Sequence, residues 1–173
     1  IDADTGEPIT GAVILAVYRL TRSFVAGQTS YIVDGQETMT DEKGEFHLPK
    51  QKKWLRLERG YPEGKLIIFK PGYGLFPWHA RAEAVGVNNP LPPPGKYIFY
   101  RIPKLTSEIE RKRNLPGAYP FDEIPYQKQK MYIDAINSEA KNIGLKPYPL
   151  PEKKGNHVSK TIRNFFSTTK TRR

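Results

Sequence analysis

The three histidines are the first residues to test for chemistry, because imidazole acts both as a metal ligand and as a general base near neutral pH. His47, His79 and His157 stand far apart in the sequence, with no pair four residues apart and no His-Glu-x-x-His arrangement. The chain has no cysteine, which excludes zinc–thiolate sites, iron–sulfur clusters, disulfides and cysteine nucleophiles. The sequence therefore predicts no metal site and no cofactor.

Serine nucleophiles have no supporting motif either. Ser23, Ser30 and Ser107 lack the flanking glycines of a nucleophile elbow, and no Gly-x-x-x-x-Gly-Lys phosphate loop occurs. We therefore expect no catalytic residue and a protein that is not an enzyme.

Three aspartates near predicted turns allow two interpretations. Asp2, Asp4 and Asp41 could bind calcium, since hard cations prefer carboxylate oxygens. Alternatively, they could accept hydrogen bonds from nearby backbone amides in Asx-turns. The ligand order of a calcium-binding loop is absent, which favours the turns.

Two groups of basic and aromatic residues are the candidate binding residues, because cations contact phosphates and aromatic rings stack on sugars or bases. The first group consists of Lys52, Lys53, Trp54, Arg56 and Trp78. The second group consists of Lys160, Arg163, Phe165, Phe166, Arg172 and Arg173. The alternative is that the tryptophans pack the ends of the fold, that the cations are solvated, and that the tail only aids solubility.

Positive charge is concentrated in the C-terminal part of the chain. The formal net charge is +10, and residues 101–173 contain 16 of the 28 Lys and Arg residues but only 7 of the 18 acidic ones. Such an asymmetry favours contact with something acidic, such as phosphate, an anionic glycan, a lipid headgroup or an acidic protein.

The elements that must position these residues are mostly short strands. Apolar runs at residues 12–18, 66–69 and 97–100 predict three core strands. Residues 41–44 predict a tight turn with Gly44 in the left-handed conformation, which would join strands at 37–40 and 45–48 in a hairpin. The poorly patterned residues 19–36 form either a long hairpin or a loop. The pattern favours a sandwich of two antiparallel sheets.

Helical signals begin after residue 103. Ser107 and Glu110 have the spacing of a capping box, which predicts a short helix to about residue 113. A second, amphipathic helix is predicted from about 122 to 143, with Gly144 ending it, and it should pack on the sandwich or on a partner. The longest apolar run covers only residues 12–18, so we expect no membrane span.

Four segments in order resemble the carboxypeptidase regulatory-like domain: residues 2–9 (DADTGEPI), 11–13 (GAV), 40–46 (TDEKGEF) and 69–73 (FKPGY). The resemblance implies a transthyretin-like, or prealbumin-like, antiparallel β-sandwich of about seven strands over residues 1–101. It further resembles stand-alone secreted bacterial members in having a helical extension, here residues 102–150, before a basic extended tail at 151–173. Two departures are the first strand, of which only Ile1 remains, and the insertion at 19–36, which could carry a contact surface or simply be a loop.

The resemblance and the charge distribution together lead to two functional expectations. The first is a non-catalytic structural or binding module outside the cytoplasm, in the periplasm, at the cell surface or secreted. It would bind a protein partner or further copies of itself through strand edges and the C-terminal arm. The second is a binder of an anionic polymer, acidic glycan or nucleic acid, through the tail and the cluster at residues 52–59. No small-molecule substrate is evident.

Overall fold

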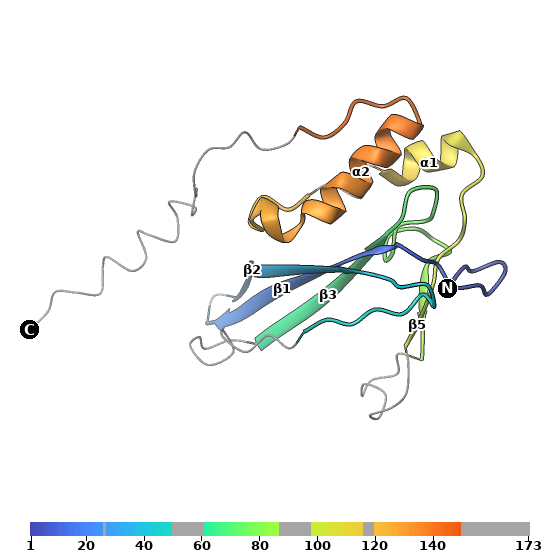
Figure 1. The fold of residues 1–173 in the computed structure, drawn as a ribbon. Coiled ribbons are helices and arrows are strands. Elements are labelled where there is room, and N and C mark those ends of the chain that lie inside the picture. The colour runs from blue at the N-terminus through green and yellow to red at the C-terminus, as the bar shows by residue number, and fades with distance from the viewer. Residues whose placement is uncertain (26, 50–60, 87–97, 116–119, 150–173) are drawn as a thin grey trace, which may run out of the picture.

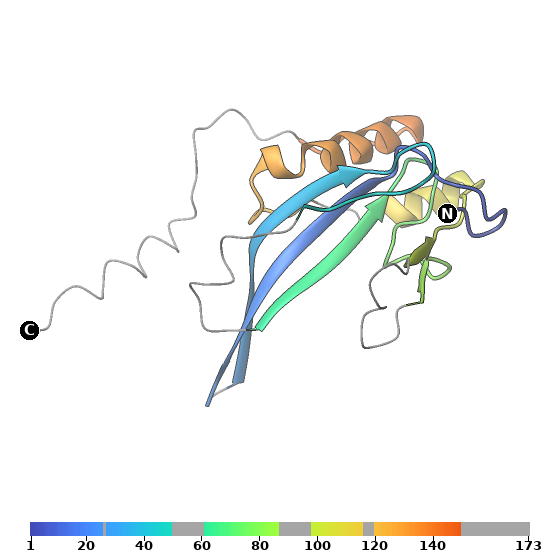
Figure 2. The same cartoon turned by 60° about the horizontal axis from the view of Figure 1, so that its bottom comes forward.

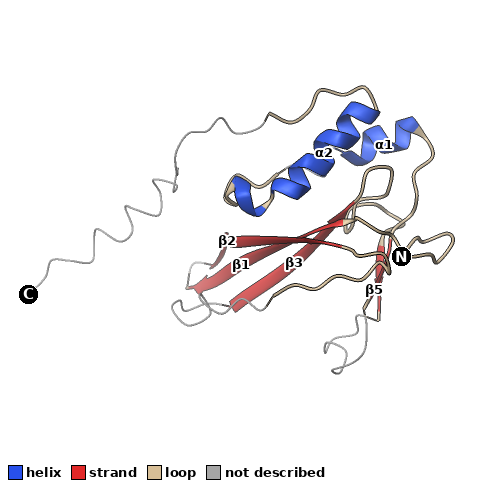
Figure 3. Ribbon diagram, in the orientation of Figure 1, coloured by secondary structure: helices blue, strands red, loops and turns tan. Residues whose placement is uncertain are grey.

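The computed structural model of the chain describes residues 1–25, 27–49, 61–86, 98–115 and 120–149. Five strands in these residues form two antiparallel sheets, which confirms a mainly β fold (Figure 3). The larger sheet has the order β2-β1-β3, with bounds β1 (Val13–Phe24), β2 (Gly27–Met39) and β3 (Tyr61–Phe69). The smaller sheet pairs β4 (Glu83–Val85) with β5 (Phe99–Arg101).

Alternating side chains of β1 and β3 build two apolar clusters on opposite faces of the larger sheet, as the two-residue period of a strand requires. One cluster contains Val13, Leu15 and Val17 of β1 and packs under the C-terminal helix. The other contains Ile14 and packs against the smaller sheet and the loops around it. The larger sheet is therefore covered on both faces, which explains why β1 reads as a continuous apolar run.

Helices cover one face of the larger sheet (Figure 1). The helical elements are α1 (Glu108–Asn114), the short 3-10 helix η2 (Tyr126–Lys128) and α2 (Lys130–Asn142). Helix α2 turns Tyr132, Ile136 and Ala140 toward the sheet. These positions recur every four residues and so lie on one side of the helix.

Strand β2 holds the start of α2 in place. Both carboxylate oxygens of Glu37 accept hydrogen bonds from the first turn of the helix, from the backbone N–H groups of Met131 at 3.0 Å and Tyr132 at 3.1 Å. The carboxylate thus caps amides that have no partner inside the helix and neutralises the positive end of its dipole. Beside it, Asp34 pairs with Lys128.

The second helix begins later than its pattern predicts, at residue 130 rather than 122. The reason is Gln129, whose buried amide accepts a hydrogen bond from the Phe121 N–H at 3.0 Å and donates to the carbonyls of Phe121 at 2.7 Å and Ile124 at 2.6 Å. These bonds fold residues 121–129 into a closed loop that helical backbone could not make.

The predicted start of the first helix is correct, but the predicted capping interaction is wrong. Ser107 is the N-cap of α1, but its side chain makes no capping hydrogen bond, so the expected capping box does not form. Glu110 instead faces His79. At the end of α2, Gly144 takes a φ of +69°, and the Leu145 N–H reaches the Ala140 carbonyl at 2.8 Å, as expected for a glycine that ends a helix.

The strand predictions have mixed outcomes. The hairpin alternative for residues 19–36 is confirmed, because β1 and β2 pair along their whole lengths. The turn at 41–44 is also confirmed, with Gly44 at a φ of +73°. The strand expected at 45–48 is wrong: these residues form no ladder, and Phe46 and Leu48 instead pack their side chains beside the second apolar cluster. Strand β4 has only three residues and was not expected.

Candidate binding surface

Most of the candidate binding residues lie outside the described part of the chain. These are Lys52, Lys53, Trp54, Arg56, Lys160, Arg163, Phe165, Phe166, Arg172 and Arg173. Their roles remain predictions.

Trp78 is the candidate residue that the structure describes. Its side chain is 46% exposed, and the Lys65 ammonium of β3 lies 4.5 Å from the centre of its ring. An ammonium over an indole face is a favourable cation–π contact. Since the lysine already occupies one side of the ring, Trp78 is held in place by the sheet and can offer a ligand only the remainder of its surface.

The loop that carries Trp78 is anchored by its other aromatic residues. Tyr73 and Phe76 are partly buried against the second apolar cluster, and the rings of Phe76 and Tyr100 meet edge to face with centroids 5.0 Å apart. Asn114, at the end of α1, accepts a hydrogen bond from the Leu75 N–H at 2.9 Å and donates to the Tyr73 carbonyl at 3.2 Å. The loop is therefore a rigid part of the fold.

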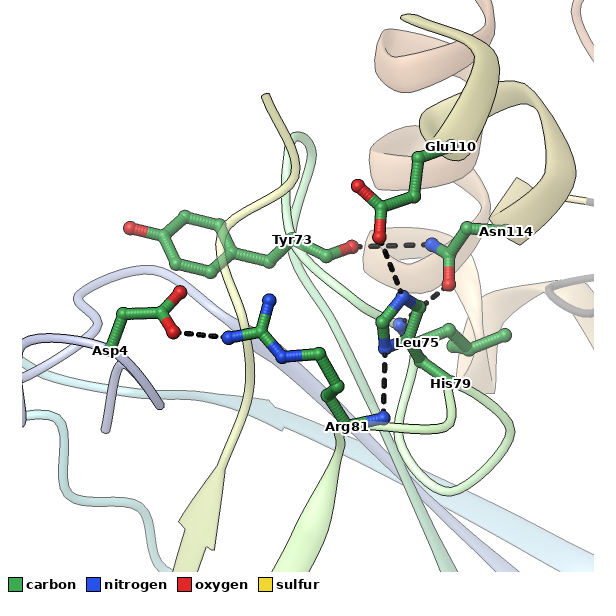
Figure 4. A network of polar contacts seen from close by, with 7 residues as sticks. All are labelled: Asp4, Tyr73, Leu75, His79, Arg81, Glu110 and Asn114. Carbon is green, nitrogen blue, oxygen red and sulfur yellow. Dashed lines mark hydrogen bonds and ion pairs between the residues drawn. The ribbon is translucent and has the colours of Figure 1, made fainter. Parts of the chain in front are cut away.

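His79 lies at the centre of this loop network, which Figure 4 shows from close by. Its Nδ1 accepts a hydrogen bond from the Arg81 N–H at 3.2 Å, and its Nε2 lies 3.4 Å from a carboxylate oxygen of Glu110. The ring packs on Gly74, where an added Cβ would come within 2.9 Å of it. Both ring nitrogens are thus engaged within the protein, so the pair of His79 and Glu110 fastens the loop to α1 and does not present a free base.

Asp2 and Asp41 make Asx-turns, as the sequence favours, but Asp4 does not. Asp2 Oδ1 accepts from the N–H groups of Asp4 at 2.8 Å and Thr5 at 3.2 Å. Asp41 Oδ1 accepts from those of Lys43 and Glu45, both at 2.9 Å. Asp4 pairs with Arg81 and so ties the first turn to the loop of Trp78.

Within the described ranges, no group of three or more His, Asp or Glu side chains could hold a metal ion. Helices long and apolar enough to cross a bilayer do not occur there either.

Residues 19–36, for which the sequence leaves open a contact surface or a simple loop, belong to the β1–β2 hairpin. A bulge at Val33 precedes Asp34, because Tyr18 pairs with Asp34 while Arg19 pairs with Ile32. We call the part beyond it, residues 19–25 and 27–32, the finger. Figure 2 shows the finger projecting away from the helices and from the smaller sheet. Its only sequence signal is a run of β-formers around residues 29–33, which is weak beside the polar residues that interrupt it.

The outer edge of β2 has different neighbours inside and outside the finger. Outside the finger, Asp34, Gly35 and Glu37 contact the segment that leads into α2. Along the finger, residues 27–32 pair with β1 on one side and with no other described strand on the other. Residues 27–30 are exposed, and residues 31–33 are half-buried.

Comparisons with protein-family models, with curated proteins and with solved structures find no match to this chain.

Proposed function

We propose that this chain is a non-catalytic binding module that works outside the cytoplasm, as a subunit of a cell-surface or extracellular assembly. The observation that carries the proposal is the outer edge of β2 along residues 27–30, which pairs with no other strand among the described residues. Such an edge presents a row of backbone N–H and C=O groups that another chain can extend as a new strand.

The composition of this edge supports a role in contact. Proteins commonly protect free edges with lysine, proline or inward-pointing charge, since an open edge invites pairing. Residues 27–33 (GQTSYIV) contain no proline and no charged residue. An edge left open in this way is expected where pairing is part of the function.

The arrangement of the two sheets supports a sandwich of the carboxypeptidase regulatory-like kind. Asp2 bridges Ile102 in parallel, which adds the start of the chain to the smaller sheet beside β5. We propose that the five described strands belong to a transthyretin-like sandwich of about seven. The resemblance to secreted members of that family is the basis for placing the protein outside the cytoplasm.

The engagement of the polar side chains supports a role without catalysis. His79 uses both ring nitrogens in the network of Figure 4, and the turn aspartates accept backbone amides. A general base needs a nitrogen or carboxylate free to take a proton from substrate.

Proline substitutions along the finger test the edge. Successive N–H groups of a strand point to opposite sides, so of Thr29 and Ser30 one directs its N–H toward β1 and the other toward the open edge. Proline at the outward position removes an edge donor and leaves the β1–β2 ladder intact. We expect sedimentation equilibrium to show concentration-dependent association of the full chain at micromolar concentrations, and the outward proline to weaken it.

The matched control is proline at the inward position, which should lower stability through loss of a ladder bond. A chain that stays monomeric, and that binds no protein from extracellular or envelope fractions in an edge-dependent way, would contradict the proposal.

A second candidate function is supported by the charge distribution. The excess of Lys and Arg in residues 101–173 favours an anionic polymer as ligand. Binding to heparin or single-stranded DNA should weaken steeply between about 50 and 200 mM salt if phosphate or sulfate contacts dominate. A flat salt response would rule out this candidate.

A further inference from the structure

The end of the finger carries two adjacent apolar side chains that face solvent. Phe24 is 61% exposed and Val25 is fully exposed. Single exposed apolar residues are common on proteins and need no explanation. Here, however, two of them stand together at the end of a projection.

The finger carries this apolar tip beyond the rest of the sheet. Strand β3 pairs with β1 as far as Thr21, whereas the β1–β2 ladder continues to the pair of Phe24 and Gly27. Three further residues of extended chain place Phe24 about 10 Å past Tyr61, the first described residue of β3. Figure 2 shows this end of the hairpin standing clear of the described elements.

The residues behind the tip carry positive charge. Residues 8–33 contain no acidic residue and two arginines, Arg19 and Arg22. Arg19 lies opposite Glu63 in the sheet register, and Arg22 lies one residue past Thr21, which pairs with Tyr61 at the start of β3. Its guanidinium sits 5.5 Å from the centre of the Tyr31 ring, about 7 Å behind Phe24 along the strand.

We propose that the finger docks on an anionic lipid surface, with Phe24 and Val25 inserted at the boundary between headgroups and acyl chains. Interfacial segments bury their apolar side chains about 5–10 Å deep, which matches the reach of the tip. At that depth Arg22 is level with the lipid phosphates, and the Tyr31 ring lies in the interfacial layer that tyrosine prefers.

The size of the tip favours a lipid surface over a protein partner. A stable protein interface buries about 800 Å² on each side, which two side chains at the end of a hairpin do not provide. A bilayer needs no complementary shape, because it closes around whatever is inserted. Docking by the tip would be weak and reversible by itself, and the net charge of +10 would strengthen it on anionic lipid.

This docking site goes beyond the proposed function and uses different groups of the finger. The tip contacts lipid through the side chains of Phe24 and Val25, whereas the edge of β2 contacts a neighbouring chain through its backbone. The two proposals can therefore fail separately, because vesicle binding tests the tip and protein association tests the edge.

Co-sedimentation with vesicles tests the proposal on the full chain. The vesicles are phosphatidylcholine alone and phosphatidylcholine mixed with phosphatidylglycerol. We expect the double variant Phe24→Asp/Val25→Asp to lose about tenfold or more in partitioning to the anionic vesicles, because insertion of both side chains is lost. Arg22→Gln should lose about fivefold on anionic vesicles only.

Phe99→Asp is the matched control. Phe99 is 51% exposed, close to the value for Phe24, but it lies in β5 of the smaller sheet, away from the finger. Its replacement should leave partitioning unchanged. An equal loss for Phe99→Asp and for the tip variant would overturn the proposal.

The basic C-terminal residues could hold the chain on anionic vesicles without the tip, so a local measurement is needed. Phe24→Trp should show a blue-shifted emission and quenching by brominated lipid when vesicles are added, relative to the parent chain and to Phe99→Trp. Vesicle-bound protein with an unshifted tip tryptophan would overturn the proposal. So would a tip variant that binds vesicles normally but loses association between protein chains, because the tip would then be a protein contact.

Discussion

Arg111 of α1 and Glu139 of α2 form a two-point ion pair, with Nε 2.7 Å from Oε1 and Nη2 2.7 Å from Oε2. The Glu139 side chain is 2% exposed, and its Oε2 also accepts the Gly72 N–H at 3.0 Å. Hydrogen bonding to this carboxylate raises the pKa of Arg111. The buried side chain of Glu139 thus joins α1 and α2 to the turn that follows β3.

We expect Glu139→Gln to lower the free energy of unfolding by about 3 kcal/mol, because it leaves a half-buried guanidinium without its counter-charge. Urea denaturation measures the change. The control is Glu108→Gln, which removes the exposed pair with Lys112 at 2.5 Å and should leave the urea midpoint unchanged. Equal effects of the two substitutions would contradict the assignment.

Glu37→Ala should cost about 1–2 kcal/mol, since it removes the acceptor for two first-turn amides of α2. Glu37→Gln keeps one acceptor and should cost less. Hydrogen exchange gives a local readout: the amides of Met131 and Tyr132 should exchange faster in the alanine variant. Glu42→Ala, at an exposed turn position, should change neither quantity.

Gly35→Ala should cost about 2 kcal/mol, because a Cβ there would come within 2.7 Å of the Ile124 side chain. Ile124→Ala alone should cost about 3 kcal/mol through the cavity it leaves in the core. The double variant relieves the clash, so its cost should fall below the sum by about 1 kcal/mol or more. Gly64→Ala, in β3 with open space at the Cβ, is the control and should be mild. Strict additivity would mean that the two residues do not oppose each other.

Tyr132→Phe should stabilise the protein by about 1 kcal/mol at neutral pH. The ring is fully buried, and the hydroxyl has no hydrogen-bond partner among the described residues. Removing an unsatisfied buried hydroxyl removes its desolvation cost.

The same hydroxyl should also affect the free energy of unfolding at alkaline pH. Burial raises the pKa of Tyr132 far above its ordinary value near 10. Because the folded pKa is the higher one, the stability linked to the neutral hydroxyl is complete below about pH 10 and is lost as the pH rises above it. The urea midpoint of each protein should be measured at neutral pH and again above about pH 10. The decrease between the two should be smaller for Tyr132→Phe than for the parent chain. Equal falls would assign the alkaline loss to Tyr18, Tyr73 and Tyr100, whose pKa values burial also raises.

The sequence predicted those elements that depend only on neighbouring residues: a core strand, a turn and a helix end. The apolar run around Leu15 predicted a core strand, and Gly44 and Gly144 predicted a turn and a helix end, because each needs only the conformational freedom of one glycine. Gln129 had no such signal. Its hydrogen bonds close a loop whose shape depends on packing against β2, so the first turns expected for the second helix do not form.

The sequence left the finger open for a related reason. Arg19 and Arg22 come directly after the apolar run of β1, so the sequence did not separate a hairpin from a loop. The structure shows these residues paired with β2 as far as Gly27, and the exposure of Phe24 and Val25 could not be read from the sequence. Trp78, in contrast, is a candidate binding residue only because of its residue type. Its contact with Lys65 could not be predicted, because the two residues lie 13 positions apart and no local pattern links them.

The apolar cluster beneath α2 joins residues near position 15 to residues near position 136. A growing polypeptide cannot seal that side of the sheet until α2 has left the ribosome, so Leu15 and its neighbours meet water, or a chaperone, while the more than one hundred residues between β1 and α2 are made.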